Sequence, residues 1–266
     1  MMPPMEHYEA SEKRLELTLA PDSKPLRALG RKAWDKVAAA AGAKVLSRLS
    51  TEACEARLLS ESSLFVWDDR VVMTTCGRTT LAAAVVEMLR VIPKTSVRSL
   101  LYERRRERFP DRQPSSFLED ARILRRLLPG RTRRFGRRLS LYRFGRRPAQ
   151  APPTVELIMH GVQAAGGLPK TLRGLLCGFK TDEHFFRPSG YSLNALSGKR
   201  YCAVHWTPDG ADSYASFETD ACTDESLGEV LRLFRPRCYD LVRIGRKTVF
   251  RHCAGTAGRR PAGRRR

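Results

Sequence analysis

The sequence contains seven cysteines, but no two of them are separated by two residues as in a CxxC pair. A CxxC pair is the usual mark of a structural zinc site, and a long chain with an odd number of cysteines is rarely built on a disulfide framework. The five histidines show neither HxxxH nor HExxH spacing, which gives no support to a metal centre. We therefore expect free thiols, no bound metal and a reducing compartment, the cytoplasm.

Long apolar runs are also missing. No stretch of 18 consecutive apolar residues occurs, which excludes a transmembrane helix. The first 17 residues are rich in acids and have no apolar core, so we expect neither a secretory signal nor a transit peptide. Hydrophobic residues make up 42% of the 266-residue chain, enough for a sizeable core in one large domain or two small ones.

Lysine is scarce, contributing ten of the 49 basic residues, so arginine carries most of the formal net charge of +21. Residues 101–147 hold sixteen arginines against five acids, and residues 259–266 add five more arginines. Such a charge by itself points to a polyanionic partner. The chain lacks Cys2His2 spacing, a basic region leading into heptads and an RNP-like aromatic signature. We therefore interpret 101–147 as a solvated basic face and 256–266 as a disordered tail, with no nucleic-acid partner.

Hydrophobic spacing predicts alternating strands and helices. Strands are expected at 9–19, 44–49, 56–59, 64–67, 71–75, 99–102, 139–144, 191–196, 201–207, 214–218 and 239–244. Helices are expected at 26–41, 80–92, 115–128 and 223–234, with a further helix starting at Thr154 and a loop at 164–170. The segments 64–81 and 201–234 share one layout, strand, turn, strand and helix, which indicates two similar halves.

One stretch carries chemistry. Residues 59–66 read LSESSLFV, and TTCG follows at 74–77. Serines around Glu61 would by themselves indicate a polar turn. The run closely resembles the LSESSMFV processing site of eukaryotic-type S-adenosylmethionine decarboxylase proenzymes, and TTCG resembles that family's KTCG. Three further segments resemble the family in the same order: HYEASEKRLEL at 7–17, RPSGYSLNAL at 187–196 and VHWTPDGADSYASFE at 204–218. The resemblance spans residues 6 to about 245.

The resemblance implies an α+β fold, a four-layer α/β-β/α sandwich of two antiparallel sheets flanked by helices, in two pseudo-repeated halves. Residues 1–255 would form a single domain that cuts itself between Glu61 and Ser62, giving a β chain of 1–61 and an α chain of 62–266. Ser62 would become a pyruvoyl group, the covalent cofactor, with no pyridoxal phosphate. Its ketone would form a Schiff base with S-adenosylmethionine and accept electrons as carbon dioxide leaves. The product would be an aminopropyl donor for spermidine and spermine.

The same resemblance assigns roles to individual residues. Ser62 would attack the carbonyl of Glu61, with His205 as the base for the later elimination and Ser192 stabilising the cyclic intermediate. Cys76 would return a proton to the substrate α-carbon. The other implied positions are Glu9 and Glu12 in the active site, Tyr8 and Phe186 stacking on adenine, Asp209 on the ribose, and the backbone at Leu59 and Glu61 beside the substrate.

A second acidic cluster concerns activation. Glu16, Glu156 and Glu218 match the residues that bind putrescine in mammalian members, whereas Arg14 matches the plant pattern, in which arginine takes the diamine's place. We therefore predict no stimulation by putrescine. The oligomeric state is left open, as a homodimer or a monomer of αβ heterodimers.

Departures from the family pattern keep other functions open. Tyr8 replaces a phenylalanine, Asp209 replaces a glutamate, and the segment 160–182 is shorter than usual. A decarboxylase of the same family acting on ornithine or arginine, and a non-catalytic regulatory paralogue, are the alternatives.

Overall fold

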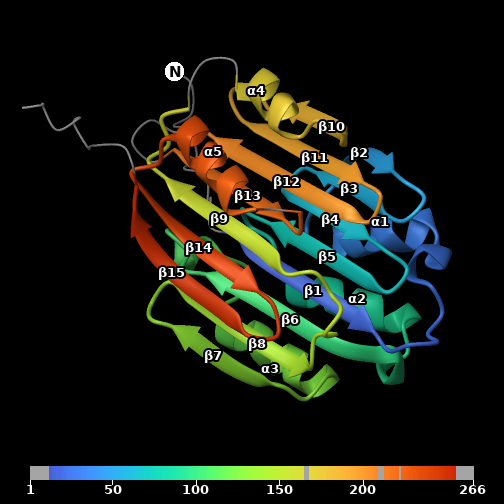
Figure 1. The fold of residues 1–266 in the computed structure, drawn as a ribbon. Coiled ribbons are helices and arrows are strands. Elements are labelled where there is room, and N and C mark those ends of the chain that lie inside the picture. Colours follow the sequence, from blue (N-terminus) through green and yellow to red (C-terminus); the bar gives the residue numbers. More distant parts are fainter. Residues whose placement is uncertain (1–11, 165–167, 209–212, 222, 256–266) are drawn as a thin grey trace, which may run out of the picture. The chain divides into compact units, whose positions relative to one another are not determined.

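A computed structural model describes residues 12–164, 168–208, 213–221 and 223–255. The chain divides into two compact units, 1–149 and 150–266. Each unit is one antiparallel sheet with helices beside it (Figure 1). Three predicted site residues, Tyr8, Glu9 and Asp209, lie outside the described residues, as does the tail after 255. The predicted single domain with its two processed chains stays a prediction.

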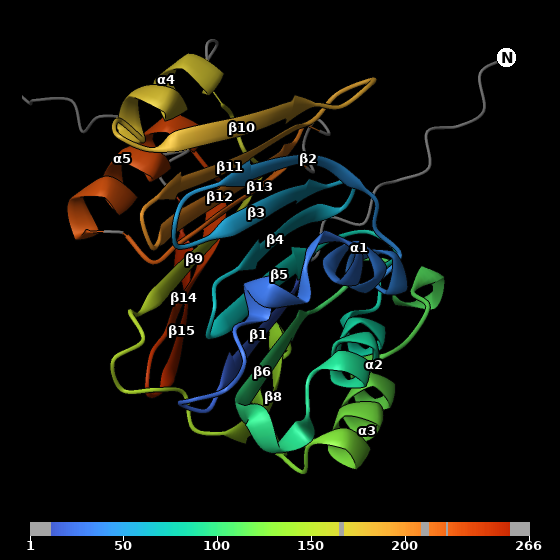
Figure 2. The same ribbon diagram turned by 90° about the vertical axis from the view of Figure 1, so that its right-hand side faces the viewer.

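The first unit contains an eight-stranded sheet in the order β2-β3-β4-β5-β1-β6-β8-β7. Its strands are β1 Lys13–Leu19, β2 Val45–Ser50, β3 Glu55–Leu59, β4 Ser62–Val66, β5 Arg70–Thr75, β6 Val97–Arg105, β7 Arg131–Phe135 and β8 Leu139–Gly145. Its helices are α1 Arg31–Ala40, α2 Leu81–Val91 and α3 Phe117–Leu127, with short 3-10 turns η1 Leu26–Leu29, η2 Lys94–Ser96 and η3 Pro110–Arg112. Figure 2 shows α2 between α1 and α3 along one face of this sheet.

The central strand β1 shows how the two faces of this sheet differ. Leu15 and Leu17 belong to the apolar core, together with Trp34 of α1 and Met88 of α2. Because side chains alternate along a strand, Arg14 and Glu16 lie on the opposite face. All seven residues of β1 are nevertheless buried. A strand with one apolar face and one buried polar face is a natural place for functional side chains.

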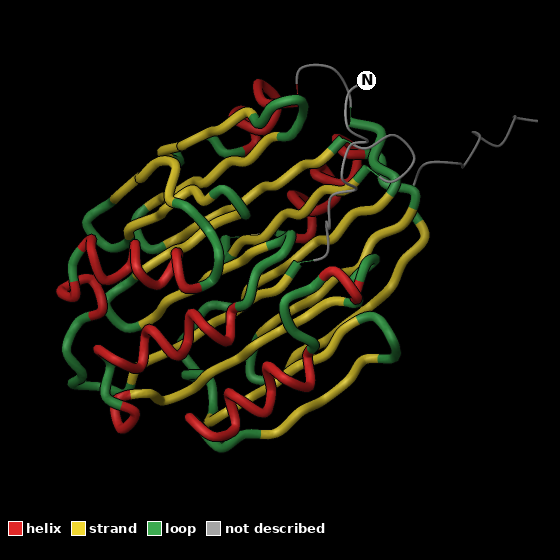
Figure 3. Tube along the Cα trace, turned by 180° about the vertical axis from the view of Figure 1, so that it is seen from behind, coloured by secondary structure: helices red, strands yellow, loops and turns green. Residues whose placement is uncertain are grey.

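The second unit contains a seven-stranded sheet in the order β10-β11-β12-β13-β9-β14-β15. Its strands are β9 Thr154–His160, β10 Lys180–Phe185, β11 Tyr191–Ser197, β12 Arg200–Thr207, β13 Tyr214–Thr219, β14 Cys238–Ile244 and β15 Thr248–Ala254. Its helices are α4 Leu168–Leu175 and α5 Asp224–Phe234 (Figure 3). Val230 and Phe234 of α5 share an apolar core with Leu157 and Met159 of β9.

The two sheets repeat one topology. The order β5-β1-β6-β8 in the first unit corresponds to β13-β9-β14-β15 in the second. In both units the first strand in sequence lies in the middle, and a helix, α2 or α5, connects its two neighbours. The predicted fold class is therefore confirmed, as two antiparallel sheets with helices in two similar halves. No helix within the described ranges is long and apolar enough to cross a membrane.

Several local predictions are wrong. Thr154 begins the strand β9 and not a helix, and the predicted loop 164–170 overlaps α4, which begins at Leu168. Strand β9 pairs with β13 and β14 and has six of its seven residues buried. A strand buried on both faces gives a continuous apolar run, which periodicity alone does not separate from a helix. The predicted helix 26–41 is divided at Gly30, whose φ of 77° interrupts it.

The interpretation of 101–147 as a solvated basic face is wrong in part. Arg104, Arg105 and Arg147 are buried, with 2%, 6% and 8% exposure. Arg104 pairs with Asp120 and Arg147 with Glu16. These cations therefore belong to buried polar networks, in contrast to exposed arginines such as Arg146.

Candidate active site

Ser62 opens strand β4 in an unusual backbone conformation. The turn at Ser60 and Glu61 connects β3 to β4, and Leu59 pairs with Ser62 across it. Ser62 has a φ of 134° and is only 2% exposed. A residue with a Cβ rarely adopts such a φ, and strain of this kind is concentrated at functional sites. The peptide bond before Ser62 is thus distinguished from its neighbours by geometry as well as by sequence.

The carbonyl of Glu61 is held by Cys76, which follows strand β5. The backbone amide of Cys76 donates a 2.9 Å hydrogen bond to this oxygen, and its Sγ lies 3.3 Å from the same atom. The hydroxyl of Ser62 lies 3.7 Å from the Sγ of Cys76. An amide hydrogen bond polarises a carbonyl and stabilises negative charge that develops on its oxygen. The hydrogen bond from Cys76 therefore makes the carbonyl carbon of Glu61 more susceptible to attack by a nucleophile.

The side chain of Glu61 has a shifted pKa. Burial raises its pKa to about 7, and the charge of Lys13 opposes this shift. A carboxyl group with such a pKa exchanges protons near neutral pH.

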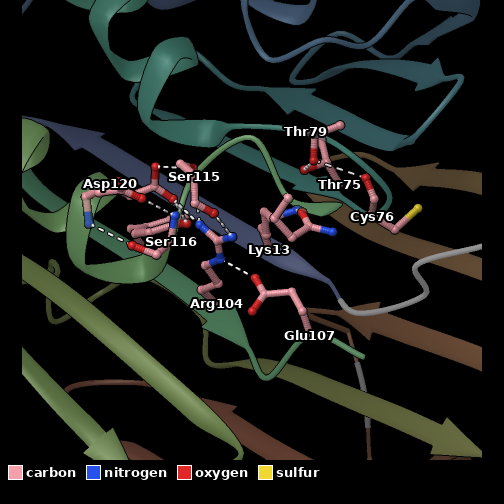
Figure 4. A network of polar contacts seen from close by, with 12 residues as sticks. Lys13, Thr75, Cys76, Thr79, Arg104, Glu107, Ser115, Ser116 and Asp120 are labelled. Carbon is pink, nitrogen blue, oxygen red and sulfur yellow. Dashed lines mark hydrogen bonds and ion pairs between the residues drawn. The ribbon is translucent and has the colours of Figure 1, made fainter. Parts of the chain in front are cut away.

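The turn after Cys76 is fixed by three side chains, those of Thr75, Thr79 and Lys13 (Figure 4). Thr79 donates a 3.0 Å hydrogen bond to the carbonyl of Cys76, and Thr75 and Thr79 share a 2.8 Å bond between their hydroxyls. Lys13 of β1 donates to the carbonyl of Gly77 at 3.0 Å and to Gln113 at 2.8 Å. Sequence reasoning missed Lys13. A lysine inside a strand whose residues are all buried is a signal that appears only with the structure.

A second pair of site residues lies within the sheet of the second unit. Ser192 of β11 and His205 of β12 are direct partners in the register. The Oγ of Ser192 lies 2.8 Å from the Nδ1 of His205. Burial lowers the pKa of His205 to about 4, against a smaller opposing effect from Glu218. The imidazole is therefore neutral at physiological pH and able to accept a proton.

Phe186 follows β10 and is half-buried. Its ring packs edge-on against His184, with 4.6 Å between the ring centroids. Glu12 precedes β1 and is buried. Leu59 ends β3 and has no exposed surface.

The residues matched to the putrescine cluster form one group in each unit. In the first unit, Glu16 accepts hydrogen bonds from Arg14 at 2.8 Å and from Arg147 at 2.6 Å. Burial alone would raise the pKa of Glu16, but the charges of Arg14, Arg147 and Arg70 outweigh it and lower the pKa to about 2. Sequence reasoning assigned Arg14 to this position and missed Arg147.

The second unit holds the other two acids of that cluster. Glu156 and Glu218 are direct partners across β9 and β13, and both are buried. The hydroxyl of Tyr201 donates to Glu218. Within the described ranges, no group of three or more His, Cys, Asp or Glu side chains is arranged to hold a metal ion.

The geometry around residues 61, 62 and 76 indicates a class of protein, the proenzymes that rearrange their own backbone at a serine. A buried serine in a strained conformation, preceded by a carbonyl that an amide polarises, is suited to an N→O acyl shift. In this reaction the acyl group of Glu61 moves from the backbone nitrogen of Ser62 to its hydroxyl oxygen.

Comparison with known proteins agrees with this class. The family model of adenosylmethionine decarboxylase matches residues 5–143 and 154–249. The chain is 31% identical to the S-adenosylmethionine decarboxylase proenzyme of Oryza sativa subsp. japonica, covering 86% of this chain and 70% of the relative. It is 31% identical to the proenzyme of Caenorhabditis elegans, covering 86% and 74%. The chain therefore belongs to the adenosylmethionine decarboxylase family, a family of pyruvoyl-dependent carboxy-lyases of polyamine biosynthesis.

A solved structure supports the fold. The crystal structure of a Trypanosoma brucei AdoMetDC-delta26 monomer aligns with a TM-score of 0.54, covering 68% of this chain and 78% of that one. The sequence identity is 23%, so this likeness is one of fold.

Proposed function

We propose that this protein decarboxylates S-adenosylmethionine after cutting itself between Glu61 and Ser62. The observation that carries the proposal is the strained Ser62 beside a Glu61 carbonyl bound by the amide of Cys76. Family membership supports the reaction class. The product would serve as the aminopropyl donor for spermidine and spermine.

In the cleavage step, the Oγ of Ser62 attacks the carbonyl carbon of Glu61, and the amide of Cys76 stabilises the oxyanion that forms. The chain then continues through an ester in place of the amide. We assign to His205 the role of the base that takes the Cα proton of Ser62 in the elimination, and to Ser192 the stabilisation of the cyclic intermediate. The neutral state of His205 within its own unit supports the first assignment. The elimination breaks the bond between Oγ and Cβ of residue 62 and releases Glu61 as a free carboxylate. Water then converts the dehydroalanine left at residue 62 into the pyruvoyl group, and the former amide nitrogen leaves as ammonia.

The residues around Ser62 fit a pyruvoyl group formed there. Ser62 is buried and its side chain lies beside the thiol of Cys76. When formed, the group supplies the carbonyl that binds the substrate amine and withdraws electrons from the carboxylate. Cys76 holds the proton that the substrate α-carbon receives after carbon dioxide leaves. A thiol is mostly protonated at neutral pH, as this role requires.

Substrate contacts are proposed from the same family match. Tyr8 and Phe186 stack on the adenine, and Asp209 binds the ribose hydroxyls. The backbone at Leu59 and Glu61 contacts the nucleoside, and Glu9 and Glu12 line the site. Aromatic faces and carboxylates both suit a sulfonium cation.

The buried acid Glu16 needs no diamine, because Arg14 and Arg147 already occupy both of its oxygens. These two guanidinium groups supply the positive charge that a diamine would bring to Glu16. We therefore assign this site to structural support, as in the plant pattern.

The experiment is intact mass spectrometry of the purified protein, followed by release of labelled carbon dioxide. Two chains divided at residue 61, the larger one beginning with pyruvate, are expected. Release from carboxyl-labelled S-adenosylmethionine, and not from ornithine or arginine, then establishes the substrate. Ser62→Ala should stay uncut, whereas the matched variant Ser63→Ala should be cut. An uncut 30.0 kDa parent chain would overturn the proposal, and exclusive release from ornithine or arginine would overturn the substrate.

A further inference from the structure

We propose that Lys13 is a positioning residue for the proton donor: together with Gln113 it fixes the turn after strand β5, and its ammonium charge acts electrostatically on the thiol of Cys76. This inference rests on the proposed function, because it concerns the same site. The proposed cleavage step does not involve Lys13, so this inference assigns a separate role to that buried cation.

The contacts of Lys13 place its ammonium at the turn that carries the thiol. Lys13 pairs with Thr75 in the register of β1 and β5, and its side chain has no exposed surface. Its Nζ donates to the carbonyl of Gly77, the residue directly after Cys76. Gly77 has a φ of 64°, so the chain reverses sharply there. The ammonium thus ties the turn to the neighbouring strand.

The second partner of Lys13 comes from a distant part of the sequence. Gln113 lies in the segment between β6 and α3. Its Oε1 accepts a 2.8 Å hydrogen bond from the Nζ of Lys13. That segment is anchored by Arg104, which donates to Asp120 at 2.6 Å and also pairs with Glu107. Ser115 donates to the same Asp120 at 2.7 Å. The network in Figure 4 therefore connects the start of α3 to the turn that follows Cys76.

Packing does not account for a lysine at this position. Removing an ammonium group from water is costly unless it is paired, and an apolar side chain of similar shape usually serves a core as well or better. Within the described part of the chain, Lys13 donates to a carbonyl and an amide oxygen, both of which are neutral. Its positive charge is therefore not cancelled by a directly bonded carboxylate among these contacts.

The charges around Lys13 come from several elements. Arg104 of β6 lies opposite in the register, and Glu107 and Asp120 offset that guanidinium. Cys76 and Glu61 lie on the side of the Ser62 turn and interact with Lys13 electrostatically. Burial, with a contribution from Arg104, lowers the pKa of Lys13 to about 8. The ammonium is therefore charged at neutral pH, where the thiol has to act.

This charge matches the chemistry of the donor. When the Sγ of Cys76 gives its proton to the substrate α-carbon, the sulfur keeps the electron pair and becomes a thiolate, which later regains a proton from water. A nearby cation stabilises the thiolate and makes the thiol a stronger acid. The fixed carbonyl of Gly77 keeps the thiol at the position where the transfer takes place.

The test measures the thiol directly, without turnover. The rate of Cys76 alkylation by iodoacetamide is followed against pH, with the modified peptide quantified by mass spectrometry. Lys13→Met removes the charge and keeps all but the last atom of the side-chain length. We expect alkylation at pH 7, where Lys13 is charged, to fall about tenfold, because the thiol becomes a weaker acid. We expect kcat to fall about tenfold with KM within about twofold, because Lys13 touches no substrate.

Two variants of Gln113 separate charge from folding. Gln113 is half-buried on a connecting segment, so its replacement leaves Lys13 in place. Gln113→Glu puts a carboxylate on the ammonium and should shift the alkylation profile in the same direction as Lys13→Met. Gln113→Leu removes the hydrogen bond without adding charge and should shift the profile least. A purely structural role would lower the melting temperature of all three variants and leave their alkylation profiles alike.

The outcomes are distinct. Alkylation profiles of Lys13→Met and Gln113→Glu that coincide with the parent overturn the role of Lys13. A shifted profile in a chain that releases no carbon dioxide from S-adenosylmethionine overturns the proposed function and supports the electrostatic effect of Lys13 on the thiol. A shifted profile together with the expected fall in kcat supports both.

Discussion

The amide of Cys76 holds the carbonyl oxygen of Glu61 at 2.9 Å, while its thiol lies 3.7 Å from the hydroxyl of Ser62. One residue thus presents two groups to one peptide bond. The amide belongs to the backbone and is kept in any substitution except proline, whereas the thiol belongs to the side chain. The proposed cleavage and the proposed turnover are therefore separable by mutation.

Cys76→Ala should still be cut, because the amide that stabilises the oxyanion is unchanged. Its kcat should fall about 100-fold or more, which is the usual contribution of a positioned general acid. Denaturing gels measure the cleavage, and carbon dioxide release measures the turnover. Cys54→Ala is the matched control, a fully buried cysteine of the same unit, and should keep its kcat. An unchanged kcat in Cys76→Ala would contradict the assignment of the donor.

His205 should make stability sensitive to acid. Its folded pKa of about 4 lies below the usual 6.5, so the unfolded chain binds an extra proton between these values. Stability is therefore lost as the pH falls through this window, by about 3 kcal/mol at most. Urea unfolding at pH 7 and pH 4.5 measures the loss. His205→Gln should show a smaller loss of stability between these two pH values.

The pair of Arg147 and Glu16 should contribute to stability. Arg147→Met leaves Glu16 with one of its two hydrogen-bonded guanidinium partners in a buried place. We expect a loss of about 3 kcal/mol in the free energy of unfolding. The neighbour Arg146 is exposed, so Arg146→Met should change it by less than about 0.5 kcal/mol. Equal effects of the two substitutions on the free energy of urea unfolding would show that the buried pair contributes no more to stability than an exposed arginine does.

The same pair should affect the response to acid. Glu16 has a folded pKa of about 2, below its ordinary value of 4.5. Its contribution to stability is thus complete above pH 4.5 and is lost as the pH falls toward 2. Arg147→Met should raise the folded pKa and so reduce this loss, as measured by unfolding at pH 5 and pH 3.

Putrescine should not stimulate the enzyme. Decarboxylation rates with and without millimolar putrescine should agree within experimental error, because Arg14 and Arg147 already satisfy Glu16. Several-fold activation of the parent would refute this expectation. Arg14→Met removes one of these cations and is the variant in which any diamine response should first be seen.

Much of the fold could be read from local patterns. The helices at 115–128 and 223–234 were predicted from capping signals, and both form with reciprocal caps at Ser116 and Thr223. The strands β7, β10 and β15 were not predicted. β7 reads RTRRF and its first four residues are exposed, so it lacks the apolar alternation that identifies a strand. It exists because β8 offers a free edge with which it pairs.

The sequence by itself determined the family, because segments such as LSESSLFV and TTCG are local and closely resemble those of the family. Tertiary structure alone decided which charges are buried. Lys13, Arg104 and Arg147 are indistinguishable in sequence from solvated basic residues, yet they end in buried networks with partners 16 to 131 residues away. The physical reason is that the cost of burying a charge is set by the groups brought around it on folding, and that arrangement is not a property of any short segment.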